Sequence, residues 1–250
     1  MQLIVNSLLT HYERSGSGKV VLLLHGWGDN LNGLRPAQLE LSRQYDVINL
    51  DLPGFGQTES PKAAWGLDEY AQFVSAFLAK LDTSPHAILA HSNGGAIAVR
   101  GLGKNYLTSD KLVLIASAGI RSEYQGKKKA LRLLAKTGKL LTLPLPKQSR
   151  EKLRRRAYKT IGSDLFVAEH LQASFKRVVT DDVQADAANI HLPTLLLYGD
   201  ADEQTPLRFG EKLHELMDHS KLSVIPGGDH FMLQKHPDEV MQQVKQFLNT

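Results

Sequence analysis

A serine that follows an apolar run has the surroundings that a nucleophile needs. The run Ala87–Ala90 stops at His91-Ser92-Asn93-Gly94-Gly95, and a helix-like segment spans 96–102. This order predicts a strand, a sharp turn and a helix, with Ser92 at the apex. The turn lifts the hydroxyl clear of the backbone, and the helix N-terminus directs unpaired N–H groups at negative charge formed beside it. The pattern is a G-x-S-x-G elbow in which Ala90 replaces the first glycine.

Two later apolar runs end in residues that could activate this serine. The run 194–198 precedes Gly199-Asp200-Ala201-Asp202, and the run 221–225 precedes Gly227-Gly228-Asp229-His230. A serine hydroxyl needs a base to take its proton, and the base needs a carboxylate to hold its tautomer. We expect His230 and Asp202 in these roles, with Asp200 as the alternative acid and Asp229 as a competing neighbour of the histidine. The order serine, acid, histidine is the one that nucleophile-elbow hydrolases use.

The elements that would position these residues alternate along the chain. Unbroken apolar runs such as Val20–Leu24 are typical of strands buried on both faces. Alternating strands and helices predict an α/β fold, a mostly parallel twisted sheet flanked by helices, with ligands beyond the carboxyl ends of the strands. The expected strands are 3–5 and 8–12 (an edge hairpin), 20–24, 46–50, 87–90, 112–116, 194–198 and 221–225; the expected helices are 34–44, 67–81, 96–102, 207–217 and 237–248.

The composition limits the class of protein. A chain of 250 residues with 42% hydrophobic content can bury one core with an insertion. We expect no membrane span and no signal peptide, because there is no run of about 18 apolar residues and no basic start before an apolar stretch. The absence of cysteine favours a cytoplasmic location. His25 and His91 have no partner at metal-ligand spacing, so we expect neither a metal nor another cofactor.

Charge is concentrated in one segment. Residues 121–160 hold 14 Lys and Arg against two acidic residues, whereas the rest of the chain holds 16 basic and 24 acidic residues. The segment is therefore a distinct unit, with expected helices at 130–143, 150–159 and 165–178. A solvated face, attraction of an anionic substrate and contact with an anionic lipid surface each explain the charge. No nucleic-acid recognition motif accompanies it, so we expect no nucleic-acid partner.

Five motifs occur in an order that is shared with one known family. The chain resembles the α/β-hydrolase superfamily, in its capped carboxylesterase-like branch, over nearly everything outside 120–190. The resemblance implies a hydrolase core in two parts, 1–119 and 191–250, with a helical cap (lid) at 120–190 between them. The motifs are His25-Gly26-Trp27-Gly28, Asp51-Leu52-Pro53-Gly54-Phe55-Gly56, His91-Ser92-Asn93-Gly94-Gly95, Gly199-x-x-Asp202-x-x-x-Pro206, and Gly228-Asp229-His230-Phe231 followed by His236-Pro237.

The resemblance also implies a role for each site residue. Ser92 would be the nucleophile, His230 the general base and Asp202 the acid that orients it, since the family spacing from Gly199 to Pro206 favours Asp202 over Asp200. The backbone N–H groups of Trp27 and Asn93 would form the oxyanion hole. The Trp27 ring would line the substrate pocket.

The expected function is that of a serine hydrolase. The substrate would be a small or medium carboxylic ester or thioester, cleaved through an acyl-enzyme on Ser92. A carbon–carbon bond hydrolase of ring-fission dienoates is an alternative with the same triad. A non-catalytic ligand-binding protein that keeps the fold is an alternative of a different class.

Overall fold

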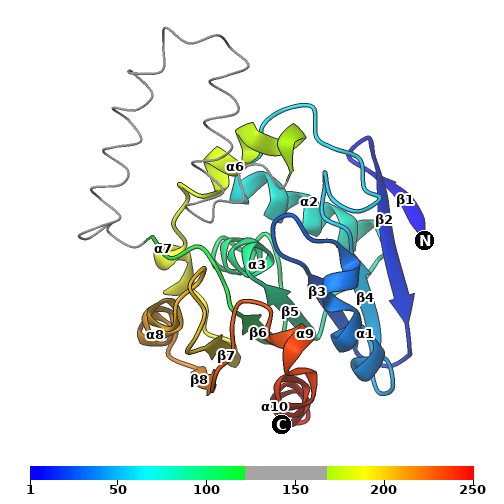
Figure 1. The fold of residues 1–250 in the computed structure, drawn as a ribbon. Coiled ribbons are helices and arrows are strands. Elements are labelled where there is room, and N and C mark those ends of the chain that lie inside the picture. The colour runs from blue at the N-terminus through cyan, green and yellow to red at the C-terminus, as the bar shows by residue number, and fades with distance from the viewer. Residues whose placement is uncertain (122–167) are drawn as a thin grey trace, which may run out of the picture.

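One mostly parallel sheet organises the molecule (Figure 1). The computed structural model of the protein describes residues 1–121 and 168–250. Within these ranges eight strands lie in the order β1-β2-β4-β3-β5-β6-β7-β8. The strands β1 and β2 form an antiparallel hairpin, β2 pairs antiparallel with β4, and the remaining pairs are parallel. Their bounds are β1 Gln2–Val5, β2 Leu8–Ser15, β3 Val20–Leu24, β4 Asp46–Leu50, β5 Ala87–His91, β6 Lys111–Ile115, β7 Thr194–Gly199 and β8 Ser220–Ile225.

Helices cover both faces of this sheet (Figure 1). The helices α2, α3, α7 and α8 pack on one face, and α1, α9 and α10 pack on the other. The 3₁₀ helix η1 precedes α1, and η3 precedes α6. The helix bounds are η1 Leu31–Leu34, α1 Arg35–Leu41, α2 Leu67–Lys80, α3 Asn93–Gly103, η3 Glu169–Leu171, α6 Gln172–Val178, α7 Gln184–Ala187, α8 Leu207–Leu216, α9 Met232–Lys235 and α10 Pro237–Leu248.

The central strands supply side chains to two separate cores. In β3, Leu22 and Leu24 belong to the core under α2 and α3, whereas Val21 and Leu23 belong to the core under α1 and α10. All four side chains are fully buried. Successive side chains of a strand point to opposite faces, so a strand covered on both faces needs an unbroken apolar run. The sheet predicted from these runs is confirmed.

Several boundaries differ from the sequence prediction. The helix after Ser92 begins at Asn93 rather than at residue 96, because the two glycines that look like turn residues are packed into its first turn. The helix expected over 34–44 ends at Leu41. Of the segment 165–178, the structure describes 168–178, which holds η3 and α6. The helices expected at 130–143 and 150–159, and most of the basic segment, lie outside the described residues.

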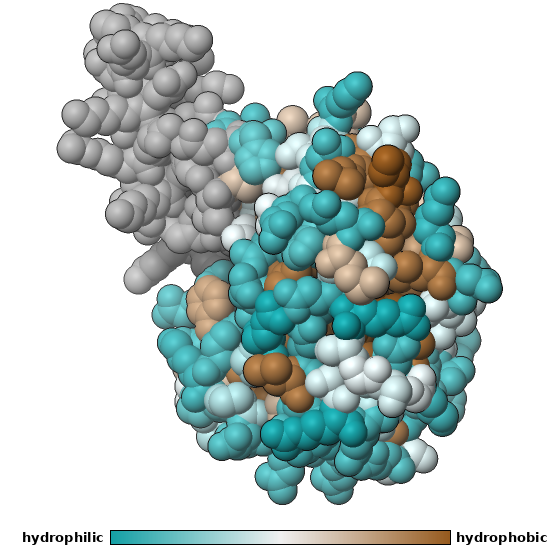
Figure 2. All heavy atoms as spheres, turned by 90° about the vertical axis from the view of Figure 1, so that its right-hand side faces the viewer, coloured by the Kyte–Doolittle hydropathy of each residue, from teal (hydrophilic) through white to brown (hydrophobic). Residues whose placement is uncertain are grey.

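The hairpin carries part of the exposed apolar surface. Met1 and Ile4 are 63% and 65% exposed, and Leu9 is also exposed. Figure 2 turns the hairpin side of the molecule toward the viewer, and apolar residues gather there in one area while polar residues cover most of the rest. Among the helices of the described ranges, none combines the length and apolar character needed to cross a bilayer.

Candidate active site

Ser92 lies at a strained turn between β5 and α3. Its φ of 51° and ψ of −117° place it in a region that non-glycine residues rarely adopt. The end of β6 holds this conformation by two hydrogen bonds. The Ser92 N–H donates to the carbonyl oxygen of Ile115 at 3.1 Å, and the Ser92 carbonyl accepts from the N–H of Ala118 at 3.0 Å. The turn therefore depends on the neighbouring strand as well as on its own sequence.

Close backbone approach explains the glycines around the serine. A methyl group on Gly94 would lie 2.3 Å from the carbonyl oxygen of Leu24, so α3 rests directly on the end of β3. A methyl group on Gly26 would lie 3.1 Å from Cβ of Ser92. The turn that follows β3 therefore passes immediately beside the serine.

Three side chains from distant parts of the sequence form one hydrogen-bonded chain. His230 Nε2 lies 2.9 Å from Ser92 Oγ, and His230 Nδ1 lies 2.9 Å from Asp202 Oδ2. Because a carboxylate only accepts, Nδ1 carries the ring proton of the neutral imidazole and Nε2 is free to accept from the serine. Asp202 follows β7 and His230 follows β8, so both come from carboxyl ends of strands. Asp202 and His230 are buried, and Ser92 is partly exposed.

Asp202 is held as a carboxylate by the groups around it. Its Oδ1 accepts from the backbone N–H groups of Gln204 and Thr205 at 2.7 and 2.9 Å. Burial by itself would raise the pKa of Asp202, but the hydrogen bond and charge of His230, together with the bonds from Thr205, outweigh burial and lower that pKa below its usual value. The acid is therefore ionised wherever a neutral imidazole could act as a base.

The alternative acids do not contact the histidine. Asp200 Oδ1 accepts from the backbone N–H of Gly227 at 2.7 Å, so it ties the turns after β7 and β8 together. Asp229 forms an ion pair with Lys235 and accepts from the N–H of Phe231. The structure thus places Asp202, and neither of these neighbours, against the His230 ring.

The loop after β3 is fixed by a buried histidine. His25 Nδ1–H donates to the carbonyl of Gly26 at 2.8 Å, and its Nε2 accepts from the N–H of Leu52 at 3.0 Å. Burial lowers the pKa of His25. The neutral ring therefore joins the loop after β3 to the loop after β4.

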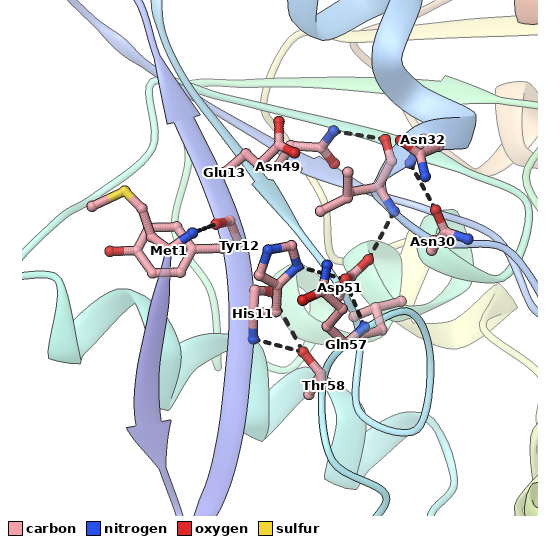
Figure 3. Close-up of polar contacts among 12 residues, drawn as sticks. Met1, His11, Tyr12, Glu13, Asn30, Asn32, Asn49, Asp51, Gln57 and Thr58 are labelled. Atoms are coloured by element: carbon pink, nitrogen blue, oxygen red, sulfur yellow. Dashed lines mark hydrogen bonds and ion pairs between the residues drawn. The ribbon is translucent and has the colours of Figure 1, made fainter.

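Asp51 connects the same two loops to the hairpin (Figure 3). Its Oδ1 accepts from the N–H of Leu31 at 2.8 Å, and its Oδ2 accepts from the N–H of Gln57 at 3.0 Å. His11, on β2, lies 2.8 Å from the same Oδ2. Asp51 is 1% exposed, so its carboxylate is sheltered from water. The motif aspartate thus stabilises the loop that carries Trp27, through partners that sequence analysis did not identify.

An aromatic wall adjoins Trp27. Its ring lies 5.0 Å from the ring of Phe55 and 5.3 Å from that of Phe175 in α6, measured between centroids. The segment that carries α6 is anchored beside it, because His170 Nε2–H donates to the carbonyl of Gly54 at 2.8 Å. The indole N–H of Trp27 and the buried side-chain amide of Asn93 have no hydrogen-bond partner among the described residues.

Two further polar residues touch the triad. His91 donates from Nε2 to the carbonyl of His230 at 2.9 Å, and the two rings are 4.9 Å apart. Burial, reinforced by the nearby His230, lowers the pKa of His91 to about 4. Thr205 places its hydroxyl 2.8 Å from Asp202 Oδ2 and 3.1 Å from His230 Nδ1. Sequence analysis missed Thr205, although a threonine three residues after an aspartate has the spacing of a local side-chain turn.

Within 1–121 and 168–250, no group of three His, Asp or Glu side chains is arranged to hold a metal ion.

Comparisons with known proteins point to one family. The AB hydrolase superfamily protein YisY of Bacillus subtilis is 26% identical over 95% of this chain and 94% of its own. A pimeloyl-[acyl-carrier protein] methyl ester esterase of Aliivibrio fischeri is 24% identical over 96% of this chain and 97% of its own. A meta-cleavage product hydrolase of Pseudomonas fluorescens has a similar structure, with a TM-score of 0.76 and 23% identity over 100% of this chain and 97% of its own.

One family model covers the strands from β3 to β8. The model of the alpha/beta hydrolase family matches residues 21–243, which include the strand ends that carry Ser92, Asp202 and His230. The sheet order and the helices on both faces agree with the fold of the structural relative. The chain belongs to the alpha/beta hydrolase family.

Proposed function

We propose that the protein is a serine hydrolase that cleaves a small or medium carboxylic ester or thioester through an acyl-enzyme on Ser92. The observation that carries this proposal is the continuous chain of hydrogen bonds from Ser92 Oγ through His230 to Asp202, with both links at 2.9 Å. Nucleophile, base and orienting acid need this connectivity to act together. A methyl ester esterase among the relatives is consistent with it.

The proposed reaction begins when Ser92 Oγ attacks the substrate carbonyl carbon. His230 Nε2 takes the hydroxyl proton, and the charge on Asp202 stabilises the imidazolium that forms. Collapse of the tetrahedral intermediate breaks the bond to the alcohol or thiol, which receives that proton from His230. A water then attacks the acyl-enzyme with His230 again as the base, which releases the carboxylic acid and restores Ser92.

The backbone N–H groups of Trp27 and Asn93 are the proposed oxyanion donors. Asn93 is the first residue of α3, so its N–H is one of those that a helix cannot pair internally. Trp27 directly follows Gly26, which lies against Ser92. Two such donors stabilise the charge that develops on the substrate oxygen, and the loss of one lowers the rate by roughly 10²–10³ in other enzymes.

We also propose that residues 120–190 form a cap over this site. Its described part supports this assignment, because Leu171 lies against Gly54 and Phe175 lies against Trp27. The aromatic wall formed by Trp27, Phe55 and Phe175 would take the apolar part of a small-molecule substrate. The excess of Lys and Arg in 121–160 favours an anionic substrate.

Covalent labelling tests the proposal. A fluorophosphonate probe should label the wild type and Ser84→Ala, in which the lost hydroxyl is on an exposed serine, but not Ser92→Ala. A panel of p-nitrophenyl esters and acyl thioesters should show turnover by the same two labelled proteins. If the wild type is unlabelled and cleaves no ester or thioester, the proposal is wrong and a ligand-binding role is favoured. Labelling combined with cleavage of a ring-fission dienoate in preference to every ester would favour the carbon–carbon bond hydrolase.

A further inference from the structure

The hydroxyl of Thr205 lies at the point where the acid, the base and a neighbouring strand meet. Thr205 Oγ1 is 2.8 Å from Asp202 Oδ2, 3.1 Å from His230 Nδ1 and 2.9 Å from the carbonyl oxygen of Ala116. The residue is 4% exposed. We propose that Thr205 is a positioning residue that couples the Asp202–His230 pair to the backbone beside Ser92. This inference rests on the proposed function of the triad.

The three contacts fit a hydroxyl and no apolar group. A threonine hydroxyl has one proton to donate and two lone pairs with which to accept. Its proton can bond to the carboxylate of Asp202 or to the carbonyl of Ala116, which are both acceptors only. Its lone pairs face the Nδ1–H of His230, so this N–H has two acceptors, the carboxylate and the hydroxyl. Two acceptor atoms rather than one, Thr205 Oγ1 and Asp202 Oδ2, therefore restrict the rotation of the His230 ring.

The contact with Ala116 links the base to the nucleophile. Ala116 follows β6 directly and has a φ of 48°, a strained left-handed conformation that a partner for its carbonyl helps to hold. Ile115, directly before it, and Ala118, two residues after it, both hydrogen-bond to the backbone of Ser92. One short segment, 115–118, thus supports the serine through its backbone and the histidine through Thr205.

Such a link matters because proton transfer depends on orientation. Ser92 Oγ and His230 Nε2 belong to residues that are 138 positions apart, and their 2.9 Å separation is set by the elements that carry them. Small displacements of a catalytic group from its productive geometry lower rates by up to roughly 10²-fold. Loss of the Thr205 hydroxyl should therefore slow the chemical step without weakening substrate binding.

Kinetics of three variants test this role. Thr205→Val removes the hydroxyl and keeps the shape, and we expect kcat to fall by about 10- to 100-fold with KM within about twofold of wild type. Thr205→Ser retains the hydroxyl, and we expect it to recover most of the lost kcat. Thr194→Val is the matched control, because Thr194 is fully buried and its hydroxyl bonds to the Leu192 carbonyl, away from the triad. Its kcat should stay near that of wild type, whatever its melting temperature.

A double-mutant cycle separates the proposed role from a structural one. If Thr205 acts through the Asp202–His230 pair, Thr205→Val should cost little in an Asp202→Asn background, measured on an activated p-nitrophenyl ester. An equal loss in both backgrounds would overturn the inference, as would a Thr205→Val enzyme with wild-type kcat or a Thr205→Ser enzyme as slow as Thr205→Val. If the fluorophosphonate probe does not label Ser92 of the wild type, the proposed function itself is wrong. The kinetic comparisons cannot give that result, because they are made among active enzymes.

Discussion

Replacement of His91 by glutamine should change how stability depends on pH. His91 donates from Nε2 to the carbonyl of His230, so its neutral ring carries no proton on Nδ1. This Nδ1 is buried, has no hydrogen-bond partner among the described residues and faces Gly26. Protonation would create a buried cation beside the His230 ring, which is 4.9 Å away. Burial is therefore the main cause of the lowered pKa of His91, about 4.

The sign and size of the effect follow from this pKa. An unfolded histidine binds a proton below pH of about 6.5, whereas folded His91 stays neutral down to about 4, so acid favours the unfolded state over this interval. At pH 5 the difference between the folded and unfolded pKa of His91 lowers the free energy of unfolding by about 2 kcal/mol. At pH 8 this residue contributes nothing, because it is neutral in both states. His91→Gln lacks this titration, so its stability relative to wild type should improve by about 2 kcal/mol between pH 8 and pH 5.

Urea unfolding followed by tryptophan fluorescence at both pH values measures this difference. Burial also lowers the pKa of His25, with the same sign, but His25 is present in both proteins and cancels. The lowered pKa of Asp202 gives stability that is lost only as the pH falls below about 4, outside the interval. His219→Gln, which removes an exposed imidazole, controls for the loss of a histidine as such. If wild type and His91→Gln lose stability in parallel on acidification, burial does not keep the His91 ring neutral in the folded state.

Three further substitutions test the scaffold of the site. Gly94→Ala should destabilise the protein by about 3 kcal/mol in urea unfolding, because its methyl group would meet backbone oxygens at 2.3 and 2.6 Å. Gly227→Ala is the control, because open space surrounds it; it should cost only about 1 kcal/mol, since its φ of 66° is left-handed. Asp51→Asn should cost about 2 kcal/mol and lower kcat on an ester, since asparagine has a single acceptor oxygen and its NH2 group cannot accept from a backbone N–H; an unchanged kcat would mean that the loop of Trp27 needs no such support. Arg100→Met should cost about 3 kcal/mol, because the buried Asp186 loses an ion pair of 2.8 Å. Equal stability of wild type and Arg100→Met in urea would show that this pair contributes nothing to stability.

The sequence by itself determined the strands of the sheet and its longer helices. The unbroken apolar runs of β3, β5 and β7 identify strands covered on both faces, because the spacing of apolar residues indicates whether one face or both faces of a strand are buried. The turns that follow β5, β7 and β8 could also be identified from local sequence, and they hold Ser92, Asp202 and His230. The five motifs that follow the strands identified the family, and the match over residues 21–243 confirmed it.

Only the tertiary structure decided which side chains meet and how tightly. His11 and Asp51 are 40 positions apart, and Thr205 and Ala116 are 89 positions apart, so no local pattern could have paired them. The helix start at Asn93 depended on tertiary packing of two glycines, Gly94 against the end of β3 and Gly95 against Ser117, which the sequence alone does not reveal. Contacts of this kind arise from the order of strands in the sheet, which brings the ends of β5, β6, β7 and β8 side by side.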